Sequence, residues 1–156
     1  MQKLINLKKE YSKVFVRDIT SLGGMIFYML NLIISIIAGQ YVLCKALAIS
    51  LVFIFLISLS LRLVYFKPRP KKQPYQNIYE RLDASSFPSI HAARITALAF
   101  IYGYVLKLSL SINIFLAIIV ILVSYTRVKL KKHYLIDVVT GVVVGAISSY
   151  ISLMMI

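Results

Sequence analysis

Long uncharged apolar runs constrain the fold of this chain more than any other feature. Residues 108–126 are 19 consecutive residues without a charge, and residues 22–38 are another 17. A helix needs roughly 20 apolar residues to cross a bilayer core of ~30 Å. The whole chain has 156 residues, of which 60% are hydrophobic and only 15% charged. Soluble domains carry about a quarter charged residues, so the chain is predicted to be a single integral membrane domain, residues 1–156.

Five segments meet this length and are predicted to be transmembrane helices, namely residues 22–38, 41–66, 88–106, 108–126 and 134–156. Short connections between them predict antiparallel neighbours. The expected fold is therefore an all-α, multi-pass helical bundle. Residues 1–20 mix apolar and basic side chains, which predicts an amphipathic helix on the lipid headgroups, the alternative being a partly ordered basic tail. Residues 67–87 include Pro68, Pro70 and Pro74 and are long enough to form a lid.

The basic residues are distributed unevenly along this chain of net charge +13. They flank apolar spans, which favours anionic lipid headgroups and phosphate as partners rather than nucleic acid. If the helices alternate in direction, all 18 Lys and Arg residues except Lys45 and Lys107 lie on one face. The positive-inside rule then predicts that this face is cytoplasmic in the cell membrane. The oligomeric state is left open, and Cys44, the single cysteine, excludes an intramolecular disulfide.

The same face holds both histidines of the chain, which is informative because ionisable groups at a membrane bundle are costly. His133 and Asp137 are four residues apart, so the carboxylate is predicted to hold one imidazole nitrogen and leave the other as a nucleophile or base. Ser89 is predicted to open a helix, where an anion is favoured. Arginine side chains match phosphate oxygens. The pattern predicts phosphoryl transfer, in which one imidazole attacks phosphorus and the other protonates the leaving oxygen.

Three motifs in order strengthen this prediction: Arg62-x6-Arg69-Pro70, then Pro88-Ser89-Ile90-His91, then Thr126-Arg127-x5-His133-x3-Asp137. This pattern resembles the signature of the type 2 phosphatidic acid phosphatase superfamily, which is usually Lys-x6-Arg-Pro, Pro-Ser-Gly-His and Ser-Arg-x5-His-x3-Asp. The chain departs from it with Arg62 for Lys, Thr126 for Ser and Ile90 for Gly. A β-branched residue disfavours a positive φ and crowds the phosphate amides, although Ile90 keeps its N–H.

The resemblance implies a role for each matched residue. His133 would be the nucleophile, Asp137 would orient it, and His91 would be the general acid. The phosphate would be held, without a metal ion or other cofactor, by Arg62, Arg69, Ser89, Ile90 and Arg127. Arg94 lies one turn beyond His91; it is expected to pair with a carboxylate such as Asp83 or to snorkel, the alternative being contact with a second phosphate or headgroup. Gly141 and Gly145 predict close helix packing within the bundle.

The expected function is a metal-independent membrane phosphatase that hydrolyses a lipid phosphate or polyprenyl diphosphate through a phosphohistidine. Two alternatives remain. A lipid phosphotransferase would pass the same phosphate to an alcohol. A non-catalytic protein would bind anionic lipids without turnover.

Overall fold

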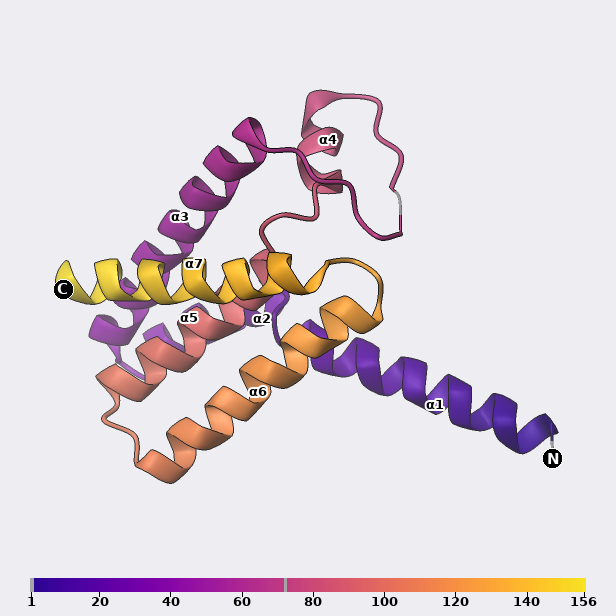
Figure 1. The fold of residues 1–156 in the computed structure, drawn as a ribbon. Helices are drawn as coiled ribbons and strands as arrows, with labels where there is room; N and C mark the ends of the chain where they lie inside the picture. Colours follow the sequence, from indigo (N-terminus) through magenta and orange to yellow (C-terminus); the bar gives the residue numbers. More distant parts are fainter. Residues whose placement is uncertain (1, 72) are drawn as a thin grey trace.

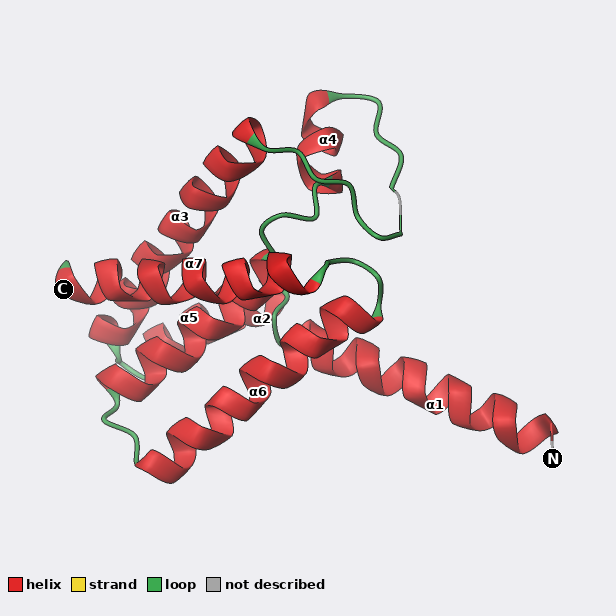
Figure 2. Ribbon diagram, viewed as in Figure 1, coloured by secondary structure: helices red, strands yellow, loops and turns green. Residues whose placement is uncertain are grey.

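The computed structural model describes residues 2–71 and 73–156, without the side chains of residues 2–6, 8 and 9. The described chain forms helices connected by turns and loops, and no strand (Figures 1 and 2). The helices are α1 (Gln2–Ser21), α2 (Met25–Ile37), α3 (Tyr41–Val64), α4 (Ile78–Ala84), α5 (Ile90–Val105), α6 (Leu110–Lys129) and α7 (Leu135–Met154). The predicted all-α bundle is therefore confirmed.

Helix α5 lies in the middle of the bundle and packs against α3, α6 and α7. Its small residues Ala92, Ala93 and Ala97 are fully buried, which lets the neighbouring helices approach closely. A Cβ at Gly141 would lie 2.4 Å from the carbonyl oxygen of Ser89, and one at Gly145 would lie 2.3 Å from that of Ala93. Both glycines thus serve α5–α7 packing, as the small-residue spacing predicts.

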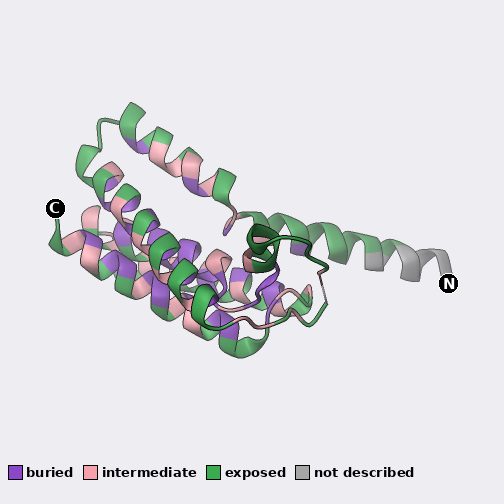
Figure 3. Cartoon of the chain, turned by 90° about the horizontal axis from the view of Figure 1, so that it is seen from above, coloured by how far each residue is buried: buried purple, intermediate pink, exposed green. Residues whose placement is uncertain are grey.

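The outer surface of the bundle is apolar, as expected for contact with lipid. Helix α6 exposes Ile114, Phe115 and Ile121 by 53 to 66%. The burial pattern in Figure 3 shows buried positions on the inward faces and exposed positions outside. A soluble monomer rarely shows such continuous apolar surface. The chain is therefore an integral membrane protein.

By length and composition, three helices of the described chain, or four if a bent pair is counted as one span, could cross a membrane, compared with the five predicted. Helices α3, α6 and α7 are long and apolar enough to cross a membrane. Helix α2 has 13 residues, about 20 Å at 1.5 Å per residue, so it is too short to cross alone. It counts as a span only together with α1, to which it is bent by 46°. Helix α5 has 16 residues and is a shorter apolar helix inside the bundle.

The N-terminal segment is one continuous helix, α1, which projects from the bundle in Figure 1. This confirms its predicted helical structure. Of the apolar residues behind that prediction, the side chains of Leu4 and Ile5 lie outside the described part. Tyr11, Val14 and Phe15 form an outward apolar stripe, each at least half exposed, whereas Val16 is buried against the bundle. Such a stripe suits a helix lying on the membrane surface.

Candidate phosphate-binding active site

The residues of the three motifs meet at one end of the bundle. Arg62, in the last turn of α3, donates hydrogen bonds to the carbonyl oxygens of Leu82 (2.8 Å) and Pro88 (3.2 Å). The Ser89 N–H at the start of α5 donates to the carbonyl oxygen of Asp137 in α7 (2.9 Å). These contacts join three helices at the face where the sequence predicts a site.

The segment between α3 and α5 covers this end of the bundle, and we call residues 67–87 the lid loop. Arg69 donates hydrogen bonds to the Gln73 side chain and to the carbonyl oxygen of Asp83. The Lys71 N–H donates to the carbonyl oxygen of Lys131 (3.0 Å) in the α6–α7 connection. The Arg69 bonds thus lie within the lid loop, and the Lys71 bond fastens the loop to the α6–α7 connection.

The start of α5 offers donors to an anion. Ser89 is the N-cap of α5, and its buried hydroxyl makes no hydrogen bond within the described structure. The first N–H groups of a helix, here from Ile90 onward, have no partner inside the helix and favour negative charge. Ile90 itself is helical and has no positive φ. The departure from Gly at this position therefore causes no backbone strain.

His133 lies in the connection before α7 and is buried, with 3% of its surface exposed. Its Nδ1 lies 2.5 Å from the carbonyl oxygen of Ser86 in the lid loop. Because a carbonyl can only accept, Nδ1 carries the proton and Nε2 has a free lone pair. Burial lowers the pKa of His133 to about 3, assisted by the positive charge of Arg127 and opposed by the Ser86 hydrogen bond. The imidazole is therefore neutral at physiological pH and suited to nucleophilic attack.

Asp137 is fully buried, but its carboxylate does not bond to His133, contrary to the prediction from their spacing. Oδ1 lies 2.6 Å from Nζ of Lys67, and Oδ2 accepts the N–H of Tyr134 at 2.8 Å. The four-residue spacing aligns side chains only when both belong to one helix. Helix α7 begins at Leu135, so His133 precedes it. Asp137 instead caps α7 and pairs with the lid loop.

Two further arginines complete the site. Arg127, in the last turn of α6, is 8% exposed and donates a hydrogen bond to the Thr20 hydroxyl at 3.0 Å. Arg94 is 6% exposed and forms no ion pair among the described residues. The expected pairing of Arg94 with Asp83 is wrong, since among the described residues Asp83 pairs with Arg69, at 4.0 Å, and not with Arg94. Its burial also excludes snorkelling to the interface.

The most informative feature of the site is a group of buried donors without acceptors. Within the described part of the chain, six such donors belong to the residues discussed above: Nε of Arg62, Arg69, Arg94 and Arg127, and Oγ of Ser86 and Ser89. A buried donor without a partner costs about 1–3 kcal/mol, more when it is charged. Burial of several together is expected where a bound anion supplies the missing acceptors. The group thus fits a phosphate.

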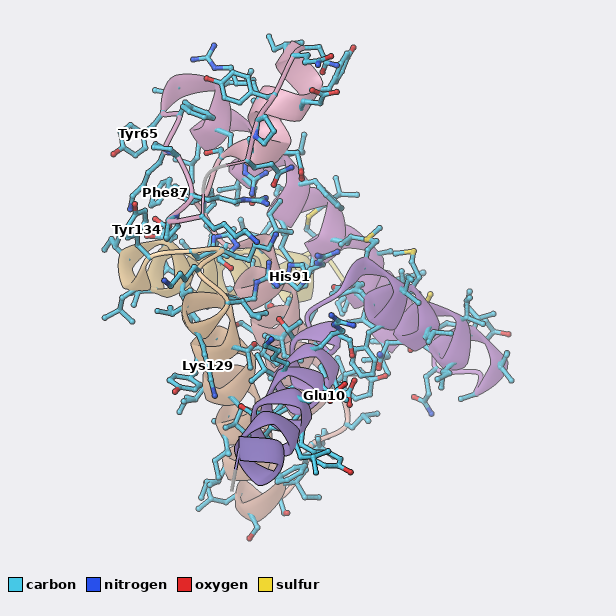
Figure 4. All side chains as sticks on the ribbon, turned by 90° about the vertical axis from the view of Figure 1, so that its right-hand side faces the viewer. Glu10, Tyr65, Phe87, His91, Lys129 and Tyr134 are labelled. Carbon is cyan, nitrogen blue, oxygen red and sulfur yellow. The ribbon has the colours of Figure 1, made fainter. Side chains whose placement is uncertain are left out.

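Figure 4 places the predicted acid His91 toward the middle of the molecule, below the lid loop. It belongs to the first turn of α5, and the main chain of His91 lies against Gly23, where a Cβ would be 2.8 Å from the His91 carbonyl oxygen. Tyr65, Phe87 and Tyr134 lie together at the outer edge of the lid loop, the first two with ring centroids 5.7 Å apart. The described residues hold no group of three His, Cys, Asp or Glu side chains placed to bind a metal ion.

Sequence reasoning missed three residues of the site: Thr20, Lys67 and Ser86. Thr20 comes from α1, far from the motifs in the chain, and Ser86 contributes a backbone carbonyl, which no residue pattern reveals. Lys67 lies between the two arginines of the first motif. Its position in the predicted lid, between two arginines of a motif, was the only signal available.

Comparison with known proteins gives two matches. Residues 37–156 match the family model of the PAP2 superfamily, which confirms the resemblance drawn from the motifs. The crystal structure of Aquifex aeolicus LpxE has the same fold, with a TM-score of 0.76 and 25% sequence identity over 90% of this chain and 84% of that chain. Among curated protein sequences, none matches this chain.

Proposed function

Because the chain belongs to the PAP2 superfamily, we propose that it hydrolyses a lipid phosphate or polyprenyl diphosphate through a phosphohistidine at His133. Family membership and the fold shared with LpxE support a lipid phosphatase. The observation that carries the finer proposal is the group of buried, acceptor-free donors around a buried neutral imidazole. That combination suits an anion that is attacked by nitrogen.

In the proposed reaction, Nε2 of His133 attacks phosphorus and the bond to the lipid oxygen breaks. His91 gives the leaving oxygen its proton and takes one from the water that then attacks the phosphohistidine to release inorganic phosphate. In the empty site, burial and the charges of Arg127 and Arg94 lower the pKa of His91 to about 3, so His91 becomes the acid only when the bound phosphate offsets those charges. Charge develops on the phosphoryl oxygens during both steps. The guanidinium groups of Arg62, Arg69 and Arg127 and the Ser89 hydroxyl with the Ile90 N–H would stabilise it without a metal ion. Asp137 contributes by holding the structure around His133.

A cavity of about 180 Å³ supports a lipid as the substrate. It lies between α2, α5 and α6, and its walls are apolar except for Asn31 and Tyr102. Leu22, at its edge, precedes the glycine that lies against His91. The cavity runs along α5 from Ile95 to Tyr102, and we propose that it takes the part of an apolar chain nearest the phosphate. The phosphate would remain at the basic end.

The orientation and the membrane partners are also proposals. The bias of Lys and Arg toward the site end supports a site on the cytoplasmic face of the cell membrane. Exposed apolar residues on α1, next to basic ones, support binding of this helix to anionic headgroups.

The test is phosphate release by the purified protein in detergent with EDTA. The panel contains phosphatidate, phosphatidylglycerophosphate and a polyprenyl diphosphate, and the product is measured as free phosphate. We expect release from at least one lipid and none from water-soluble phosphate esters. Lipid binding without release would instead favour the non-catalytic alternative.

The phosphotransferase alternative is tested in the same assay with an added alcohol. Transfer of the phosphate to the alcohol, in place of release, would assign the protein to that class. We expect free phosphate as the main product because the chain belongs to a superfamily named for its phosphatases.

A further inference from the structure

Lys67 contacts two groups at the start of α7. Its Nζ lies 2.6 Å from Oδ1 of Asp137, which is fully buried, and 4.5 Å from the ring centroid of Tyr134. The other carboxylate oxygen of Asp137 accepts the Tyr134 N–H. One carboxylate oxygen therefore holds Lys67, and the other holds the first turn of α7. If Lys67 moved away, the buried charge of Asp137 would lose its ion-pair partner.

The backbone of Lys67 holds the opposite side of the lid loop. Its carbonyl oxygen accepts the N–H of Ser86 at 2.7 Å, its own N–H donates to the Ser85 hydroxyl at 3.4 Å, and an antiparallel bridge joins Pro68 with Ser85. The Ser86 peptide is thus placed by the Lys67 peptide. The carbonyl of that same Ser86 residue accepts the proton on Nδ1 of His133.

These contacts form a continuous chain from Asp137 through Lys67 and Ser86 to His133. We propose that Lys67 is a positioning residue, whose ion pair with Asp137 fixes the Ser86 carbonyl and so keeps Nε2 of His133 unprotonated and aimed at phosphorus. Asp137 then acts on the nucleophile through the lid loop rather than by direct contact. The proposal rests on His133 as the nucleophile of the proposed function. Lys67 itself does not touch the phosphate.

The experiment compares Lys67→Met, which removes the charge and keeps much of the stem, with Lys67→Arg, which keeps the charge. Lys129→Met is the matched control, since Lys129 also lies near a tyrosine ring, that of Tyr125 at 5.9 Å, but has no carboxylate partner among the described residues. The double variant Lys67→Met with Asp137→Asn avoids an unpaired buried carboxylate if the single variant folds poorly. Two readouts are used: kcat and KM of phosphate release, and the ¹⁵N shifts of the His133 ring.

We expect Lys67→Met and the double variant to lose at least tenfold in kcat with KM within twofold of the original. Their His133 ring should change from one tautomer, protonated at Nδ1, to a mixture. Lys67→Arg should recover much of both, and Lys129→Met should change neither. A single unchanged tautomer in Lys67→Met would overturn the proposal, as would a raised KM with unchanged kcat, which would assign Lys67 to substrate binding.

The ring shifts separate this inference from the proposed function, because they are measured without substrate. If the original protein releases no phosphate from any lipid, the proposed function fails. A change of tautomer in Lys67→Met would still support the positioning role in that case.

Discussion

The chemistry open to each residue of this site depends on its hydrogen-bond and ion-pair partners. His133 has one partner, the Ser86 carbonyl on Nδ1, and Nε2 is left for chemistry. Arg94 is buried and pairs with no carboxylate in the part of the chain that the structure describes. Motif spacing predicted His133 as part of the site but predicted the wrong partner for it. Arg94 was expected to pair with a carboxylate such as Asp83 or to snorkel, with contact to a phosphate or headgroup as the alternative. The spacing of nearby residues cannot predict a partner that is a distant backbone carbonyl, and it cannot predict that a partner is absent.

The protonation of His133 gives the first prediction. Because burial and Arg127 hold its pKa at about 3, the ring should stay neutral from pH 8 down to pH 5. The chain has two histidines, so a ¹³C-labelled His91→Gln variant gives a single imidazole signal to titrate. A midpoint near the ordinary value of about 6.5 would contradict the buried, Ser86-bonded imidazole.

The same low pKa has a consequence for stability. Between about pH 6.5 and pH 3 the unfolded chain protonates His133 and the folded chain does not, so acid favours unfolding over this range. We expect His133→Gln to lose less stability than the original protein between pH 7 and pH 5 in thermal unfolding. Equal losses in both would count against the low pKa.

Arg94→Gln separates a binding role from a structural one. If Arg94 meets phosphate, the variant should bind inorganic phosphate roughly tenfold more weakly, the size expected for one charge-assisted hydrogen bond. Its thermal stability should stay the same or rise, because a buried charge without a partner is removed. Arg17→Gln, an exposed change on α1, is the control for both measurements. A large loss of stability with unchanged phosphate affinity would show that Arg94 is structural.

At the level of helices, the sequence was a better guide than it was for ion pairs. Apolar runs predicted the helices, and small residues predicted their packing. All five apolar segments form helices, and Gly141 and Gly145 pack α7 onto α5 as their spacing indicates. The length of α2 was predicted less well, because the uncharged run from residue 22 includes Gly23 and Gly24, and the chain turns there between α1 and α2. Hydropathy reports apolar composition but not a bend.

Gly141→Ala tests the α5–α7 contact. The new methyl group would lie 2.4 Å from the Ser89 carbonyl oxygen, a backbone atom that can move only with the start of α5. We expect lower thermal stability, by about 1–3 kcal/mol for such overpacking, and weaker phosphate binding because Ser89 shifts. Val143→Ala, at a half-exposed position on the same helix, should affect neither. An unchanged Gly141→Ala protein would contradict the close packing.

Ala99→Phe tests the proposed chain-binding cavity. Ala99 lines the space between α2, α5 and α6, and a phenyl group there would fill it. We expect KM to rise several-fold for long-chain substrates and to stay the same for short-chain ones, with kcat unchanged. Equal effects on both chain lengths would show that the cavity does not hold the lipid chain.

The whole molecule has a basic end, a lipid-facing apolar surface and an opposite end with Lys45 and Lys107. This asymmetry was readable from the sequence because alternating helices assign each connection to one end. The side of the membrane is tested with single cysteines in a Cys44→Ala background. If the site is cytoplasmic, Lys71→Cys should react with an impermeant thiol reagent only after cells are permeabilised, and Lys45→Cys should react in intact cells. The reverse pattern would place the site outside.

The central claim is that His133 carries the phosphate during turnover, and rapid quenching tests it most directly. A lipid substrate labelled with ³²P at the phosphate is mixed with the protein in EDTA and stopped in alkali within milliseconds. The account predicts an acid-labile, alkali-stable label on the protein, which is absent from His133→Gln and present in Lys129→Met. Phosphate release at an undiminished rate by His133→Gln would contradict it.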